Sequence, residues 1–397
     1  MHLPIFRHRE PQSRHQRSLH LVLFESAITA GSFCTPIMTP FFLSIGLSQA
    51  EISVTQALFT IAVLLIDFPT GWLADRFGRK WANVLGDFGA ALAYFLYATA
   101  NSFASVVFCE CLLGFFMAFS EGVDFSLLKH FSGKVQPEES YFRRQVARLS
   151  LWQHVANLTF VILGGPLGAI NFRLAIVCSG LSRVIGGLIS LGINDDSERL
   201  QKIANNPLRD MARIAISSFR QRELRTHIFA YAIGREMTHG IIWVFTPMLM
   251  LAGVPLSIVS MGWAVNSLFC VVGSRLAERY SQHLSSRQVM AIPLALMAVS
   301  MATLTIQINL WTVSLYLLMG VVQGWTGATL MPRLQQYVSA GEQTSVVSLA
   351  KVVAKLLYVP AVCLIGIAAD IQLNYAATVT LVIFLPLGLL TMHAFKE

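Results

Sequence analysis

Charged side chains are scarce in this 397-residue sequence, since Asp, Glu, Lys and Arg supply only 13% of it, about half of their usual share in soluble proteins. Apolar residues supply 55%, with 26 Phe and a mean hydropathy of +0.60. One soluble core could not bury that many large apolar side chains. The composition therefore excludes a soluble enzyme, a nucleic-acid-binding module and a disordered scaffold, and it indicates a protein that crosses a membrane many times.

Cysteines are also few, and none of the six has the spacing of a metal site. Cys109 and Cys111 are separated by one residue and have no second pair, so they are interpreted as small hydrophobic filler. The segment Gly78-Arg-Lys80 lacks the glycine spacing of a nucleotide-binding loop, and no nucleophile elbow is present. We therefore expect no metal, no cofactor and no ATP-driven or enzymatic chemistry.

Windows of about 20 apolar residues, the length that crosses a bilayer, recur along the chain. Several contain Gly or Pro, which membrane helices tolerate better than soluble ones. The first 18 residues are polar and basic, so we expect no cleavable signal peptide here. We expect an all-α membrane protein with twelve transmembrane helices, at roughly 20–45, 50–73, 81–100, 103–128, 149–170, 173–192, 226–250, 256–277, 288–306, 310–332, 345–367 and 373–394.

Only one connection between the expected spans is long. It divides the chain into an N-terminal six-helix bundle at 1–193, a cytoplasmic linker at 194–225 and a C-terminal six-helix bundle at 226–397. The stretch from Pro207 to Arg225 inside the linker is amphipathic, which predicts a helix. We favour a linker helix over one that lies along the membrane surface.

The basic residues predict the orientation of the chain. Of 29 Lys and Arg, only Arg173 falls in an outward-facing connection, and four lie inside spans, at Arg183, Arg235, Lys351 and Lys355. Lys and Arg accumulate in cytoplasmic loops of membrane proteins. Both termini are therefore expected in the cytoplasm, and the short loops favour a bacterial inner membrane.

The two halves of the sequence contain related segments. Gly71-Trp-Leu-Ala-Asp75-Arg76-Phe-Gly78-Arg79-Lys80 follows the second expected span, and Ser274-Arg-Leu-Ala-Glu278-Arg279-Tyr280 follows the eighth. Val155 to Val161 in the fifth span likewise resembles Val353 to Val359 in the eleventh. Such internal repeats predict two related bundles with a central cavity.

The segment from Gly71 to Lys80 resembles the loop 2–3 signature of the major facilitator superfamily, and the resemblance extends over the whole chain. Asp67, ahead of the signature, and Glu121 with Asp124, in the fourth span, resemble a bacterial efflux-like subgroup. The resemblance implies transport by alternating access. It also implies a gating motif formed by Asp67, Gly71, Asp75, Arg76, Gly78, Arg79 and Lys80, with a degenerate copy at Glu278 and Arg279.

Two positions depart from the antiporters of that superfamily. Many proton-coupled members have an Arg four residues before a Gly in the fourth span, and this chain has Glu110 four residues before Gly114. The fifth span has Gly165-Pro166-Leu-Gly168, but Ala169 breaks the glycine pair of the antiporter signature. Both departures weaken a prediction of drug antiport and leave the expected fold unchanged.

Ionisable residues inside spans are costly and often functional. Glu25 is the first candidate for proton coupling because it stands alone in an apolar first span, followed by Glu121 and Asp124. Asp87 and Arg183, on peripheral spans, are expected to form a structural pair. In the superfamily, spans 1, 4, 7 and 10 line the cavity, so the candidates there and beside it for substrate contact are Arg235, Glu236, His239, Lys351, Lys355, His154, Asn157 and Glu110.

The cations of the C-terminal half suggest an anionic or zwitterionic organic solute. The leading hypothesis is a proton-coupled exporter, an antiporter that acts as a monomer on a small organic solute and protons in the lipid bilayer. A proton-coupled importer of a nutrient anion keeps the same fold and reverses the flow. A lipid flippase or a non-transporting sensor on the same scaffold is the third hypothesis.

Overall fold

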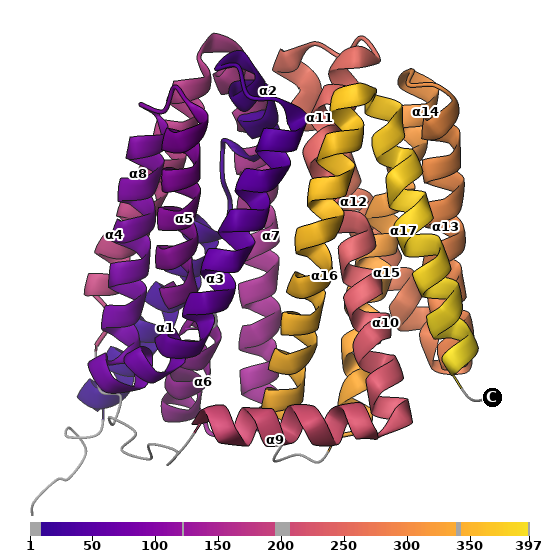
Figure 1. Ribbon diagram of the computed structural model, residues 1–397. Helices are drawn as coiled ribbons and strands as arrows, with labels where there is room; N and C mark the ends of the chain where they lie inside the picture. Colours follow the sequence, from indigo (N-terminus) through magenta and orange to yellow (C-terminus); the bar gives the residue numbers. More distant parts are fainter. Residues whose placement is uncertain (1–8, 121–122, 195–206, 339–342, 396–397) are drawn as a thin grey trace, which may run out of the picture. The chain divides into compact units, whose positions relative to one another are not determined.

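The computed structural model describes residues 9–120, 123–194, 207–338 and 343–395. All regular elements in these ranges are helices, which Figure 1 shows in chain order. Their bounds are α1 (Arg9–Ala30), η1 (Thr35–Ile37), α2 (Met38–Ser44), α3 (Gln49–Phe77), α4 (Arg79–Tyr97), α5 (Phe103–Ser120), α6 (Val123–Val135), α7 (Glu139–Ile170), α8 (Phe172–Leu191), α9 (Pro207–Arg220), α10 (Arg222–His239), α11 (Ile242–Leu251), α12 (Leu256–Tyr280), η2 (Ser281–His283), α13 (Ser286–Ile306), α14 (Leu310–Leu315), α15 (Leu318–Gln336), α16 (Gln343–Ile371) and α17 (Leu373–Ala394).

The expected all-α membrane architecture is confirmed. Within the described ranges, nine helical segments are long and apolar enough to cross a membrane. The other three expected spans correspond to α3, α4 and the pair α10 and α11. The amphipathic stretch predicted after Pro207 forms α9, which packs against α10 and α16 and lies crosswise to α16 in Figure 1.

Three of the expected spans are not continuous helices. The first is divided between α1 and α2 with η1 between them, the seventh breaks between α10 and α11, and the tenth contains the short α14 before α15. Hydropathy alone predicts one continuous helix for each. Helix breaks inside a bilayer are tolerated where neighbouring protein satisfies the freed backbone groups, and no proline marks the break after His239.

The chain forms two compact units. Unit 1 contains residues 1–36 and 62–203, and unit 2 contains residues 37–61 and 204–397. The expected bundles differ from these units at one place, because α2 and the first part of α3 pack with the second half of the chain. Thr39, in α2, donates a hydrogen bond to the carbonyl oxygen of Trp243, in α11, at 3.0 Å.

The N-terminus of α3 explains why its first turns belong to unit 2. Ser48 and Glu51 bond to each other's backbone amides at 3.2 and 2.9 Å, which is a capping box. The Asp370 carboxylate near the end of α16 also accepts bonds from the amides of Gln49 and Ala50, at 2.6 and 3.0 Å. A carboxylate placed there satisfies free N–H groups and complements the helix dipole.

The ends of α2 and α11 provide a structural sign of the internal repeat. Gly46 follows α2 and Gly253 follows α11, and both have positive φ, at 88° and 90°. In each case the next residue bonds back to a carbonyl of the last helical turn, Leu47 to Phe42 and Val254 to Leu249. These matching ends have the hydrogen bond of a Schellman motif and lie at corresponding places in the two halves.

Close packing in unit 2 depends on small residues between α12 and α15. A Cβ on Gly324 would collide with the carbonyl oxygen of Cys270, and one on Gly273 would collide with that of Val321. Without side chains at these positions the two backbones come into contact, which is the usual way that membrane helices associate. The pair holds α15 in place, and α15 forms one wall of the pocket described below.

Candidate functional site

Unit 1 brings three acidic side chains together. Glu25 lies on α1, Asp87 on α4 and Asp124 on α6, and the carboxyl group of Glu25 is within hydrogen-bonding reach of both of the others. Glu25 and Asp87 are 1% and 0% exposed. We call Glu25, Asp87 and Asp124 the acid cluster. Glu25 stands alone in its own span, but α4 and α6 bring to it two acids that are far away in sequence.

The acid cluster is held by neighbouring polar side chains. Asp87 pairs with the Arg183 guanidinium of α8 at 3.4 Å, which confirms the predicted pair. Ser26 donates to Asp124 at 2.7 Å and accepts a bond from Gln153 of α7 at 2.7 Å. The positions of the three carboxyl groups are thus fixed by side chains from α1, α4, α6, α7 and α8.

The cluster has more acceptors than donors. One carboxyl oxygen on each of the three acids has no hydrogen-bond donor among the described residues. Three carboxylates and the one guanidinium of Arg183 would leave two negative charges uncompensated, which is costly in an apolar surrounding. A proton on an acid removes a charge and provides a missing donor, so the arrangement is chemically suited to bind protons.

Unit 2 contains a pocket of about 350 Å³ between α10 and α15, within the usual range for small-molecule sites. We call it the α10–α15 pocket. Two of the predicted substrate residues, Arg235 and His239, line it. Its other lining residues are Tyr231, Thr238, Gln323, Thr326, Gly327, Leu330 and Met331.

Arg235 is the charged group of this pocket. Its side chain is 46% exposed, its Nε lies 3.2 Å from Glu236, and its Nη1 donates to the Tyr231 hydroxyl at 3.4 Å. Lys355 of α16 is a further electrostatic neighbour of Glu236. The Arg235 guanidinium thus lies half-exposed in the pocket lining, where it can donate hydrogen bonds to an anionic group.

His239 contributes a second polar group. Its Nδ1 lies 2.7 Å from the carbonyl oxygen of Arg235, which is an acceptor, so Nδ1 carries the hydrogen. That assignment leaves Nε2 as the acceptor of the ring. The pocket therefore offers an arginine donor, an imidazole acceptor and the amide of Gln323 to a bound molecule.

The other predicted substrate residues lie outside both groups. His154 is exposed on α7, with its Nδ1 2.6 Å from the Ser150 carbonyl oxygen, and Asn157 lies beside Gly31, the residue that follows α1. Glu110 is buried on α5 within hydrogen-bonding reach of Tyr97. Lys351 is exposed on α16, one turn before Lys355. Glu121, a predicted proton carrier, lies outside the described residues.

The predicted gating motif spans the junction of α3 and α4. Asp67, Gly71, Asp75 and Arg76 lie on α3, in a stretch whose side chains are outside the described part of the structure. Gly78 separates the helices with φ of 97° and ψ of 140°, a conformation that favours glycine. Arg79 and Lys80 begin α4, and the Lys80 ammonium lies 5.6 Å from the Trp81 ring.

The degenerate copy of the motif lies at the end of α12. Glu278 pairs with Arg275 at 3.0 Å on the surface, and the guanidinium of Arg279 lies 5.7 Å from the Tyr280 ring. Arg333 at the end of α15 donates to the carbonyl oxygens of Ser281 and Leu284, both at 2.7 Å. This clamp fixes the connection after the copy.

Sequence reasoning missed several residues of both groups. Asp87 was interpreted only as a partner of Arg183, and Ser26, Gln153, Tyr231 and Gln323 were not considered. The helical spacing of four between Tyr231 and Arg235, and between Gln323 and Gly327, places them on one face. That spacing could have identified Tyr231 once Arg235 was chosen, whereas the position of Gln323 beside Arg235 depends on how α15 packs against α10.

Comparisons with known proteins agree with this architecture. A sequence model of the Major Facilitator Superfamily matches residues 21–361. A nucleoside transporter, NupG, has a TM-score of 0.78 and 14% identity, with 96% of this chain and 99% of that chain covered. A bacterial homologue of the human lysosomal transporter Spinster, inward-facing and unoccupied, has a TM-score of 0.74 and 15% identity, with 98% of each chain covered. No curated protein sequence matches the chain.

Proposed function

The chain belongs to the major facilitator superfamily and is a membrane transporter rather than an enzyme, and we propose that it exports a small anionic or zwitterionic organic compound in exchange for protons. Alternating access, as the family resemblance implies, would carry the solute. The acid cluster supports the proposal most directly. A group of three carboxyls, two on buried residues and one on a half-buried residue, each with an unpaired buried oxygen, is a place where protons bind and leave.

The proton and the solute are assigned to different units. In unit 1, Glu25 is the central carrier because it reaches both other acids, while Asp87 is already paired with Arg183. In unit 2, Arg235 orients the anionic group of the solute, and His239 and Gln323 accept and donate hydrogen bonds to its polar atoms. The predicted cytoplasmic orientation and inner-membrane location belong to the same proposal.

Proton flux in liposomes tests the proposed coupling. Purified protein is reconstituted with an internal pH dye and challenged with pools of carboxylates, peptide-like compounds, siderophores and nucleosides, the last because NupG transports them. We expect one pool to cause proton movement with the wild type and none with Glu25→Gln. Glu138→Gln is the matched control, since Glu138 is an exposed acid just before α7 and lies outside the acid cluster and the gating motif.

The sign of the dye signal separates the two directions of transport. Protons that move against the solute indicate exchange, and protons that move with it indicate the importer. If no pool moves protons although a compound raises the melting temperature of the protein, coupling is contradicted and a facilitator, flippase or sensor is favoured. If Glu25→Gln retains the full proton signal, the proposed role of Glu25 is wrong.

A further inference from the structure

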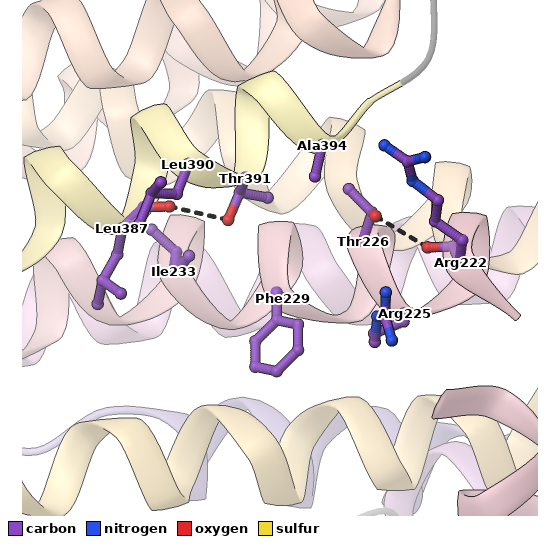
Figure 2. A pocket seen from close by; sticks show the side chains of 9 residues that line it. All are labelled: Arg222, Arg225, Thr226, Phe229, Ile233, Leu387, Leu390, Thr391 and Ala394. Atoms are coloured by element: carbon purple, nitrogen blue, oxygen red, sulfur yellow. Dashed lines mark hydrogen bonds between the residues drawn. The ribbon is translucent and has the colours of Figure 1, made fainter. Parts of the chain in front are cut away.

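A second cavity in unit 2 lies between α10 and α17 and has no part in the proposed transport site. It has a volume of about 240 Å³, and Figure 2 shows the side chains that line it. On α10 these side chains recur with helical spacing, and α17 provides the opposite side. We call it the α10–α17 groove, and its lining residues are Arg222, Arg225, Thr226, Phe229, Ile233, Leu387, Leu390, Thr391 and Ala394.

One end of the groove is cationic. Arg222 and Arg225 are exposed there, and neither forms an ion pair with a carboxylate in the described part of the chain. Glu223, the adjacent acid, is an electrostatic neighbour of His227, whose ring contacts the rings of Tyr337 and Phe395 in tilted and edge-on arrangements. Nη1 of Arg225 donates to the carbonyl oxygen of Phe219 at 3.5 Å, and the other N–H groups of the two guanidiniums are available to an anion.

The rest of the groove is apolar. Phe229, Ile233, Leu387 and Leu390 form it, and Phe229 and Leu390 are 42% and 68% exposed. The hydroxyls of Thr226 and Thr391 donate to carbonyls of their own helices at 2.8 Å, as Figure 2 shows. Since those hydroxyls are already satisfied, no polar group of the lining faces a ligand beyond the two arginines.

The distribution of polarity identifies the ligand as an anionic amphiphile. α17 is long and apolar enough to span a membrane, and the arginines lie at the beginning of α10, next to the amphipathic α9. Basic groups at a helix end, next to an apolar groove, match a lipid with its phosphate at the surface and its chain in the bilayer. We propose that the α10–α17 groove binds an anionic phospholipid, with its phosphate on Arg222 and Arg225 and an acyl chain along Phe229 and Leu390.

Native mass spectrometry of the full-length protein tests this proposal. The protein is titrated with phosphatidylglycerol or phosphatidylcholine of the same acyl chains. Each arginine near an anionic headgroup contributes roughly fivefold to affinity. We therefore expect the double variant Arg222→Gln/Arg225→Gln to bind phosphatidylglycerol about 30-fold more weakly than the wild type. Arg143→Gln/Arg144→Gln, an adjacent exposed pair on α7 in unit 1, should bind it as the wild type does.

A filled groove tests the acyl-chain part while the charges remain. Ala394→Trp should weaken phosphatidylglycerol binding, whereas Val382→Trp, on the exposed face of the same helix, should not. Glycerol phosphate, which has no acyl chain, should not compete. The proposal is overturned if the arginine variant binds normally, if phosphatidylcholine binds equally well, or if glycerol phosphate competes as strongly as the lipid, which would indicate a free-phosphate site.

Discussion

At the scale of single residues, Arg183 is the cation that contacts the acid cluster in the described part of the chain. Its guanidinium is 13% exposed and contacts Asp87, whose carboxyl is fully buried. Removal of one partner from a buried ion pair usually costs about 3–5 kcal/mol, because the other charge stays buried without compensation. Here the remaining acids can avoid part of that cost, since each of them can take up a proton.

This leads to a prediction for Arg183→Gln. The variant should be less stable than the wild type, and the loss should be larger in alkaline than in acidic buffer. The reason is that three acids without a cation are least costly when protonated, and acidic buffer supplies the protons. Thermal unfolding of the purified variant across pH measures this difference, with Arg275→Gln on the surface as the control. An equal loss at every pH would show that the acids do not exchange protons.

The residue that was hardest to assign from sequence is Asp87. Its pairing with Arg183 could be predicted, because Asp87 and Arg183 are rare ionisable residues in apolar spans. Its proximity to Glu25 could not, because it depends on how α1 and α4 rotate about their own axes. Sequence periodicity gives the face of a helix, but the partner of that face is set by tertiary packing.

At the scale of elements, α3 is held at its N-terminus by Asp370. The carboxylate accepts two backbone N–H bonds there, so a neutral side chain should weaken the attachment of α3 to α16. We expect Asp370→Asn to destabilise the protein by about 1 kcal/mol, the usual value of a helix cap or a charge at a helix dipole. The measurement is thermal unfolding, with Glu278→Gln as the control because Glu278 forms an exposed surface ion pair. We expect Asp370→Asn to have the lower melting temperature of the two. Equal melting temperatures would contradict the capping role.

The α12 and α15 pair gives a second prediction at this scale. Gly324→Ala should lower the melting temperature by several degrees, because its Cβ would meet the backbone of Cys270 and push the helices apart. Gly327→Ala, one turn further along α15, is the matched control, since no atom lies within 4 Å of a Cβ there. It should leave the stability unchanged or increase it, because alanine favours a helix over glycine. If the two variants have the same melting temperature, close backbone packing is not what holds α15.

Most helices of this chain could be predicted from hydropathy, and their breaks could not. The spans were expected from windows of apolar residues, and that signal is averaged over about 20 residues. It is therefore insensitive to the one or two residues at which α10 ends and α11 begins. The amphipathic α9 was predicted from a different signal, because its apolar residues recur with the period of a helix although its mean hydropathy is low.

At the scale of the whole molecule, the internal repeat was the most informative feature of the sequence. It predicted two related bundles, and the matching ends of α2 and α11 are a structural sign of it. The assignment of residues 37–61 to unit 2 could not be predicted, because it depends on contacts such as those of Asp370 and Thr39. Substrate identity depends on the shape of the α10–α15 pocket, and the sequence provides only its charge.

The central claim is that unit 1 handles the proton and unit 2 handles the solute. With the solute found in the flux screen, two activities are measured in liposomes: exchange of labelled for unlabelled solute, and accumulation driven by a pH gradient. We predict that Glu25→Gln retains exchange and loses gradient-driven accumulation, whereas Arg235→Gln loses both. A Glu25→Gln protein that still accumulates solute with the gradient, or that loses exchange as completely as Arg235→Gln, would contradict the claim.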